Sequence, residues 1–448
     1  MTKFAKIPLV KKLIITLFCA LSVLCGGQAF AAKLDLMADV QTKVVSYTNP
    51  DFASDTTDGV YFLQNVRLGF VLKDIHPSGT TANATDVGIV LRSLGVAGST
   101  ITLHHPFSDA ASHYPSSDMT PYVEQAYVKI SNMLDRDMTL VAGRQDFRLA
   151  SGLTLSDDGA GFTGFRFKQG SLYKDLAVTG FVFQPKSMDS ESGDVNILGL
   201  SFEVPSDGLW QAYSFFELDK RGETINLRQS DKAVRNFTGL SYIMRYGNLS
   251  FSGEGAIEKG TAYAANSADS NVAYDGSALI LTGKWDQPLW ALGTGSAHLS
   301  YGRASGDKDS SSDTSEAFFP SFGHRYNGIE RSGFGEFFGA SLYDAMGGST
   351  STITGMPDGV SGMRMVNLGI TLPAFAGIYT DFDYFIFEAD TSTLGSKQIG
   401  RELDVKFSYP IRDQIRMTAV GAFFSPGGVY ADNTPSANKF SFELVGRF

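Results

Sequence analysis

The stretch that decides the fold is KFSFELVGRF, residues 439–448, at the C-terminal end of the sequence. In an extended strand, successive side chains point to opposite faces. One face then carries Phe440, Phe442, Leu444, Gly446 and Phe448, and the other carries Lys439, Ser441, Glu443, Val445 and Arg447. An apolar face backed by a polar one is typical of a strand in a transmembrane β-barrel. Taken alone, the pattern fits an edge strand of a soluble β-sandwich equally well.

The N-terminal segment predicts export. Residues 1–12 hold four lysines and no acid, residues 13–24 are almost entirely apolar, and Ala29-Phe30-Ala31 supplies small residues for cleavage. This is the pattern of a secretory signal peptide rather than of a membrane span. We expect a signal peptide over residues 1–31 and a β-barrel over residues 32–448. Both cysteines, Cys19 and Cys25, lie in the signal, so the mature chain is predicted to have no disulfide, thiolate metal site or covalent haem.

Composition narrows the class of protein. The formal charge is −10, and removal of the four signal lysines makes it −10 − 4 = −14. This acidity argues against nucleic acid or an anionic lipid surface as the main partner. Gly (48), Phe (34) and Tyr (18) are abundant, and after the signal no apolar run approaches the roughly 20 residues of a membrane helix. No shift in composition marks a domain boundary.

Alternation of apolar and polar residues recurs along the chain at strand length. Examples are residues 198–204, 249–258 and 402–409, each with one apolar and one charged face. We count about 18 candidate strands in one series, an even number as expected for a bacterial barrel. A closed barrel is the strand-built structure that crosses lipid, because closure satisfies every edge N–H and C=O group. The predicted fold is therefore all-β, a transmembrane antiparallel β-barrel of 18 strands in the bacterial outer membrane.

The connections between candidate strands are of two kinds. Short turns rich in Pro, Gly, Asn and Asp occur at residues 205–208, 246–248 and 410–413, and long polar segments occur at residues 104–120, 259–275, 303–331 and 347–362. Outer-membrane barrels have short turns on the periplasmic side and long loops outside. We expect the same division here.

Several motifs resemble those of the bacterial alginate-export family of outer-membrane β-barrel porins. They occur in that family's order at residues 126–128, 140–145, 161–166, 304–307, 318–320, 324–328, 400–404 and 423–427. The resemblance implies an 18-stranded barrel with an arginine-lined constriction that passes an anionic polysaccharide. It also implies that Arg144, Arg166, Arg401, Glu402 and Asp404 lie in or near the pore.

Charged residues on adjacent candidate strands form the strongest functional set. Arg144, Asp146, Arg148, Arg166 and Lys168 are expected to share an inward face, where cationic groups hold carboxylates. The eight predicted pore-lining residues are Arg144, Asp146, Arg148, Arg166, Lys168, Arg401, Glu402 and Asp404. The alternative is that these charges pair with neighbouring acids and stiffen the barrel wall, and the two roles are compatible.

Other sites carry weaker signals. Asp307, Asp309 and Asp313 lie in a Ser- and Gly-rich loop but lack the Gly and terminal Glu of a calcium-binding loop. His104, His105 and His113 are interpreted as exposed loop histidines rather than as a transition-metal site. We therefore predict no metal and no cofactor.

The sequence favours a channel without covalent chemistry. No serine-hydrolase signature surrounds His298, the histidine placed on a candidate strand, so we predict that the protein is not an enzyme. The expected partners are outer-membrane lipid or lipopolysaccharide and an anionic solute or polysaccharide. The alternative is a barrel sheath in a multiprotein conduit, with a periplasmic or cytochrome protein in the lumen.

Overall fold

A computed structural model describes residues 32–448 apart from 51–58, 76–83, 98–106, 108–109, 111–112, 134–136, 171–174, 187–193, 223, 267, 289–292 and 343–355. The predicted signal peptide, His104 and His105 lie outside the described residues. Within the described residues, no helix is long and apolar enough to span a membrane.

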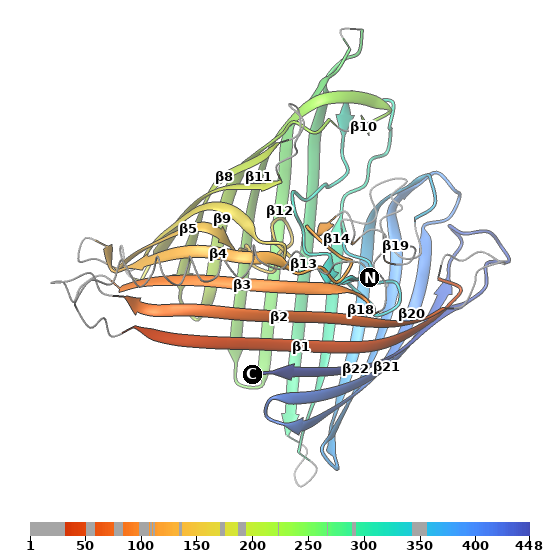
Figure 1. Cartoon of the computed structure of the whole chain (residues 1–448). Helices are drawn as coiled ribbons and strands as arrows, with labels where there is room; N and C mark the ends of the chain where they lie inside the picture. Colours follow the sequence, from red (N-terminus) through yellow and green to blue (C-terminus); the bar gives the residue numbers. More distant parts are fainter. Residues whose placement is uncertain are drawn as a thin grey trace, which may run out of the picture.

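Eighteen antiparallel strands form one closed barrel (Figure 1). The first nine are β1 (Lys33–Thr48), β2 (Gly59–Ile75), β3 (Ala84–Val96), β4 (Tyr122–Ser131), β5 (Met138–Gln145), β6 (Phe162–Gln169), β7 (Ala177–Lys186), β8 (Val195–Pro205) and β9 (Gly208–Asp219). The rest are β11 (Arg228–Tyr246), β12 (Leu249–Ala264), β13 (Val272–Pro288), β14 (Thr294–Ala304), β18 (Val360–Phe375), β19 (Ile378–Ser392), β20 (Gln398–Arg412), β21 (Ile415–Pro426) and β22 (Ala437–Arg447). The predicted strand number is confirmed.

The C-terminal strand closes the barrel. β22 pairs antiparallel with β1 from Asp39↔Arg447 to Thr48↔Asn438, and Figure 1 shows the blue and red ends of the chain side by side. Phe448 adds two backbone bonds to Ala38, with N···O distances of 2.8 and 3.0 Å. Every strand therefore has two neighbours, as a sheet in lipid requires.

The alternation sorts the side chains as predicted. In β22, Phe440, Phe442 and Leu444 are exposed on the outer face, whereas Lys439 and Ser441 are buried inside. The short turns between β8 and β9, β11 and β12, and β20 and β21 lie at the predicted positions. They mark the periplasmic end.

The two expected long loops at residues 303–331 and 347–362 belong to a single connection. β14 pairs directly with β18, so no barrel strand lies between them, and residues 305–359 form one segment. Its described part holds the two-residue strands β15 (Thr314–Ser315), β16 (Tyr326–Asn327) and β17 (Glu330–Arg331). β10 (Thr224–Ile225) is a further two-residue strand, paired with β11.

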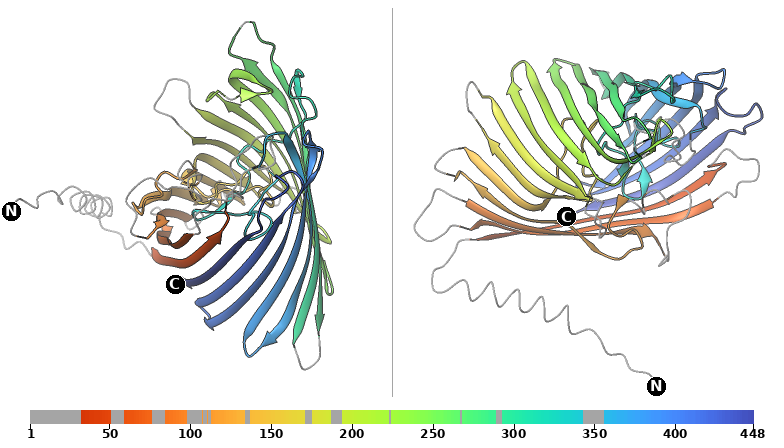
Figure 2. Two further views of the ribbon diagram at one scale, coloured as in Figure 1. Left: turned by 90° about the vertical axis from the view of Figure 1, so that its right-hand side faces the viewer. Right: turned by 90° about the horizontal axis from the view of Figure 1, so that it is seen from above.

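The described parts of the connections after β5 and β14 fold back into the barrel, as the views in Figure 2 show. Tyr114, from the connection after β3, is buried against both of them. We call residues 146–161, between β5 and β6, the short inner loop and residues 305–342 the long inner loop. They meet at a bridge between Leu155 and Phe322, where the Phe322 N–H donates to Thr154 O at 3.1 Å. Together they occupy the extracellular half of the lumen.

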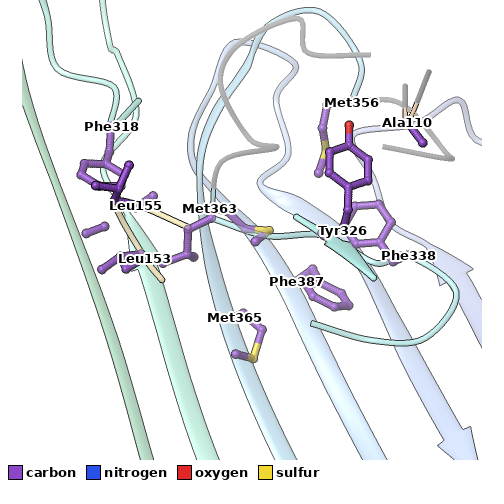
Figure 3. Packing of buried hydrophobic residues seen from close by; sticks show 14 of the residues in the cluster. Ala110, Leu153, Leu155, Phe318, Tyr326, Phe338, Met356, Met363, Met365 and Phe387 are labelled. Atoms are coloured by element: carbon purple, nitrogen blue, oxygen red, sulfur yellow. The ribbon is translucent and has the colours of Figure 1, made fainter. Parts of the chain in front are cut away.

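An aromatic core joins these loops to the wall. Leu153, Leu155 and Phe318 gather on one side in Figure 3, and Phe338 lies near Phe387 of β19, with ring centroids 4.9 Å apart. These side chains are almost fully buried. Because burial of a Phe side chain contributes about 1.5–3 kcal/mol, a handful of such contacts is enough to hold a loop in place.

Inward-facing acids of the wall bind the backbone of the long inner loop. Glu402 accepts N–H donors from Phe337 and Phe338 at 2.6 and 3.0 Å, and Asp404 accepts the Glu336 N–H at 2.9 Å. Gly335 permits this approach: its φ is 78°, and a Cβ there would lie 2.7 Å from a Glu402 carboxylate oxygen. Glu402 and Asp404 are thus anchors for the loop.

Other acids of the barrel wall also accept hydrogen bonds from backbone N–H groups of the inner loops. Glu258 accepts the Phe319 N–H at 2.8 Å, and Glu254 accepts the Ser151 N–H at 2.8 Å. An intramolecular hydrogen bond contributes about 0.5–1.5 kcal/mol to stability. Four wall acids therefore hold the inner loops inside the barrel: Glu402, Asp404, Glu258 and Glu254.

Candidate functional site

A large cavity lies in the periplasmic half of the lumen. It has a volume of about 700 Å³ and is bounded by the inward faces of β1–β4 and β20–β22 and by the lower edges of both inner loops. Its charged lining residues are Asp39, Glu124, Asp146, Asp157, Asp158, Asp413, Glu443, Arg67, Arg92, Arg148, Lys406, Arg412, Arg416 and Arg447. Seven acids face seven Arg and Lys residues, so we call it the mixed-charge cavity.

Ion pairs fix part of this lining. Arg67 binds Glu124 through two hydrogen bonds of 2.8 and 3.0 Å and Asp39 through a third of 3.1 Å. Arg92 donates to Asn65 at 3.0 Å and to the carbonyl of Gly159 at 3.2 Å. These contacts join the wall to the short inner loop.

A second cavity of about 390 Å³ lies against the inward face of β4–β9. Its charged lining residues are Lys129, Arg148, Arg166, Lys168 and Glu203, beside hydroxyl groups such as those of Thr139, Thr179 and Ser201. Four cations against one acid give a formal charge of 4 − 1 = +3. Lys168 pairs with Glu203 at 2.9 Å. We call this the basic cavity.

The two cavities adjoin at Phe147 and Arg148, which line both. The Phe147 N–H donates to Asp157 at 3.1 Å, and Arg148 Nε donates to the carbonyl of Ser151 at 2.9 Å. The Arg166 guanidinium lies 6.0 Å from the centroid of the Phe147 ring. The short inner loop therefore holds an arginine and an aromatic ring where the cavities meet.

Neighbouring carboxylates of the short inner loop titrate differently. Burial, together with the charges of Asp146 and Glu124, raises the pKa of Asp157 to about 6. Hydrogen bonds from the N–H groups of Phe147 and Gly161 lower this pKa but do not outweigh burial. Burial also acts on Asp158, but hydrogen bonds from His324 and the Arg325 N–H hold its pKa below the usual range. Asp158 lies 2.6 Å from His324 Nδ1 and so ties the two inner loops together.

The predicted pore-lining residues divide into three groups. Asp146, Arg148, Arg166 and Lys168 line one or both cavities. Glu402 and Asp404 point inward but lie buried beneath the long inner loop, which their carboxylates anchor.

Arg144 and Arg401 depart from the expectation and line neither cavity. Arg144 pairs with Ala126 and Thr163, and its guanidinium donates to the carbonyl of Ala160. In β5 it is Thr139 and Val141, not the alternate residues, that face the basic cavity. Arg401 shares the outer face of β20 with Leu403 and Phe407, both exposed, because it directly precedes the inward Glu402 and consecutive residues of a strand face opposite sides.

Several residues that line the two cavities were not predicted from the sequence. Arg67 and Lys129 follow the same alternation as Arg166 and were open to the same reasoning. Arg412 and Arg416 flank a periplasmic turn, and His324 reaches the mixed-charge cavity from the long inner loop. The Phe pairs at 318–319 and 337–338, apolar in an otherwise polar segment, were the signal that this loop folds inward.

The other candidate sites show no chemistry of their own. Within the described part of the chain no group of three His, Asp, Glu or Cys residues is placed to hold a metal ion. His298 pairs with Asp383 at 2.9 Å, and no described serine hydroxyl bonds to its ring. Asp313, in the acidic loop, pairs with Arg228 at 2.6 Å.

A closed 18-stranded barrel with an apolar outer face and a charged interior has the architecture of an outer-membrane porin, and it places the protein in the bacterial outer membrane. No family model and no curated protein matches the sequence. The resemblance to the alginate-export family therefore stays a prediction.

Solved structures of outer-membrane proteins share the fold. OccK8 (OprE) of Pseudomonas aeruginosa is similar with a TM-score of 0.55 at 12% identity, over 93% of this chain and 98% of that one. OccAB1 of Acinetobacter baumannii is similar with a TM-score of 0.57 at 12% identity, over 94% of this chain and 98% of that one. The outer membrane protein opdK of Pseudomonas aeruginosa is similar with a TM-score of 0.51 at 13% identity, over 92% of this chain and 99% of that one. At these identities the likeness concerns the fold.

Proposed function

We propose that the protein is an outer-membrane channel for small anionic solutes. The observation that carries the proposal is the basic cavity, where Lys129, Arg148 and Arg166 lie with Lys168 on one wall of the lumen. Among the described residues, Glu203 is the only acid that lines it. Rings or bands of Arg and Lys in a pore favour anions over cations. Hydroxyl groups beside the cations supply further donors to a carboxylate.

Cavity size supports a small solute rather than a polymer. Volumes of about 700 and 390 Å³ fall within the roughly 300–1,000 Å³ of sites for small molecules. The two inner loops and their aromatic core occupy part of the lumen beside these cavities. Export of an alginate-like polysaccharide is the finer form of the proposal, and it requires the long inner loop to move aside.

The sheath hypothesis has less support. A sheath needs an empty lumen that another chain can fill, whereas here residues 146–161 and 305–342 fill much of it and are held by wall acids such as Glu402 and Glu254. A cytochrome or other periplasmic partner would have to displace both inner loops.

The test is single-channel recording of the refolded full-length mature protein in a planar bilayer. We expect an anion-selective reversal potential in a KCl gradient, and Arg166→Glu to lower the anion preference, since it changes the formal charge of the basic cavity from +3 to +1. Lys259→Glu is the matched control, because Lys259 is exposed and pairs with Asp275 on the outer face.

Uronate probes separate the two forms of the proposal. Block by monomeric glucuronate supports a small-solute channel, and block by uronate oligomers alone supports polysaccharide passage. A closed barrel, or a cation-selective one whose selectivity is unchanged in Arg166→Glu, would overturn the proposal.

A further inference from the structure

Three arginines lie on the outside of the barrel. Arg303 of β14 and Arg364 of β18 are paired across the sheet, and paired residues point to the same face. That face also carries exposed Leu279, the partner of Arg303 in β13. Arg401 of β20, which the family resemblance placed in the pore, also points outward. It pairs with Ile386 of β19, which pairs with Val366 of β18, so it lies two strands from Arg364 and two residues further along the sheet. The strands β14, β18, β19 and β20 are neighbours in Figure 1.

A shared carboxylate holds two of these arginines in place. Asp390 Oδ1 accepts Arg303 Nε at 3.1 Å and Arg364 Nε at 2.8 Å, and Asp390 Oδ2 accepts the Gly306 N–H at 3.2 Å. Asp390 is buried, whereas the side chains of Arg303 and Arg364 keep 48% and 42% of their surface exposed. The guanidinium groups are thus oriented by a fixed acid and still present donors outward.

The cluster has more cations than anions. Like charges directly opposite each other on a sheet destabilise it, and Arg303 and Arg364 face each other with one buried carboxylate between them. Glu388, opposite Arg364, adds a second acid and Arg401 adds a third cation, so the formal charge is 3 − 2 = +1. Within the part of the chain that the structure describes, Arg401 has no charged or hydrogen-bonded partner.

The position of the cluster selects the ligand. Arg303 lies near the end of β14, and Arg364 and Arg401 lie near the starts of β18 and β20, all at the end opposite the short turns. Exposed Val366 and Leu403 follow Arg364 and Arg401 two residues further on, a rise of about 6.7 Å along a strand. The polar layer on each side of a bilayer is roughly 5–7 Å thick. The guanidinium groups therefore stand at the headgroup level of the outer leaflet.

We propose that Arg303, Arg364 and Arg401 form a binding site for the phosphate groups of an outer-leaflet lipid. Guanidinium groups bind phosphate through paired N–H donors, and an external anion compensates the excess positive charge of the cluster. A lipid is favoured over a dissolved anion because the donors sit directly above the apolar band and face away from the lumen. Lipopolysaccharide, the partner expected from the sequence, supplies such phosphates.

The test compares lipids with and without phosphate on the purified barrel in detergent. Bis-phosphorylated lipid A is titrated, and retained lipid is counted by native mass spectrometry. A basic residue near an anionic membrane surface contributes about 1 kcal/mol, or about fivefold in affinity. We expect Arg401→Gln to weaken binding about fivefold and Arg303→Gln/Arg364→Gln/Arg401→Gln to weaken it about one hundredfold, with partial recovery in Arg401→Lys.

The controls keep the proposal falsifiable. Arg245→Gln removes an exposed cation at the periplasmic end and should leave lipid A binding unchanged. The single Arg401 variant breaks no ion pair or side-chain hydrogen bond among the described residues, and it serves if the triple variant fails to fold. Equal binding of dephosphorylated lipid A would overturn the proposal, and so would full displacement of lipid A by inorganic phosphate, which would indicate a site for dissolved anions.

Discussion

Asp157 and Asp158 show how surroundings set the role of a residue. Both are buried in the short inner loop, yet Asp158 gains His324 and two backbone donors from the long inner loop, whereas Asp157 lies near the acids Asp146 and Glu124 and bonds to backbone N–H groups alone. Asp158 is therefore an anchor. Asp157 is a titrating group where the two cavities meet.

Titration of Asp157 should change ion selectivity. Its pKa of about 6 means that the folded protein takes up a proton as the pH falls from 7 to 5, which removes a negative charge near Arg148. A unit charge about 8 Å from an ion is worth ~2 kcal/mol at an effective dielectric of about 20. After screening we expect the anion-to-cation permeability ratio to rise about threefold, with a midpoint near pH 6.

Reversal potentials between pH 5 and pH 7 check this expectation. At every pH, Asp157→Asn should show the anion preference that the unmodified protein has at pH 5. Asp413→Asn changes a cavity-lining residue in the turn between β20 and β21 and should keep the pH dependence. The pH dependence of folding stability that Asp157 contributes is opposite in sign to that of a salt-bridged acid. Since the folded-state pKa lies above the ordinary 3.8, stability falls as the pH rises from about 4 to about 6.

At the scale of elements, we expect the long inner loop to limit the conductance of the barrel. Phe337 and Phe338 pack on Phe424 of β21, with ring centroids 5.9 and 4.9 Å away, and both are fully buried. Their N–H groups bind Glu402. Side chains and backbone thus fix the same two residues to the wall.

Replacement of both aromatics should release this loop. Phe337→Ser/Phe338→Ser removes about 3–6 kcal/mol of apolar burial while the strands stay paired. We expect larger and noisier single-channel conductance and faster proteolysis within residues 305–342. Phe375→Ser, which changes an exposed Phe at the turn between β18 and β19, is the control. Unchanged conductance in the double variant would show that the loop does not limit the pore.

At the scale of the whole molecule, closure joins the two ends of the described chain. The pairs Asp39↔Arg447, Val40↔Gly446 and Gln41↔Val445, with the bonds of Phe448 to Ala38, fasten the periplasmic end of the β1–β22 seam. Without them β1 would present unpaired N–H and C=O groups to lipid, at a cost of several kcal/mol each.

Removal of residues 445–448 should therefore destabilise the barrel far more than a change of side chain does. We expect this truncation to abolish the compact, heat-sensitive band that a folded barrel gives in electrophoresis. Phe448→Ala, which keeps every backbone bond, should retain it. A truncated protein that still gave a stable compact band would contradict the importance of these pairs.

The sequence by itself determined the barrel. Alternation placed the strands, the short turns and the inward positions of Arg166, Lys168, Glu402 and Asp404, because a strand's two faces follow directly from residue order. The same rule would have turned Arg401 outward, since it adjoins Glu402, but the family resemblance carried it into the pore.

Only the tertiary structure decided what fills the lumen. The fate of residues 305–342 depends on contacts with Glu402, Glu258 and Phe387, which lie on strands far away in the chain, and no local periodicity encodes such contacts. The same holds for Arg144, which turns to the Ala160 carbonyl of the short inner loop. Local alternation sets which way a side chain points, but long-range packing sets whether it meets solvent, lipid or another loop.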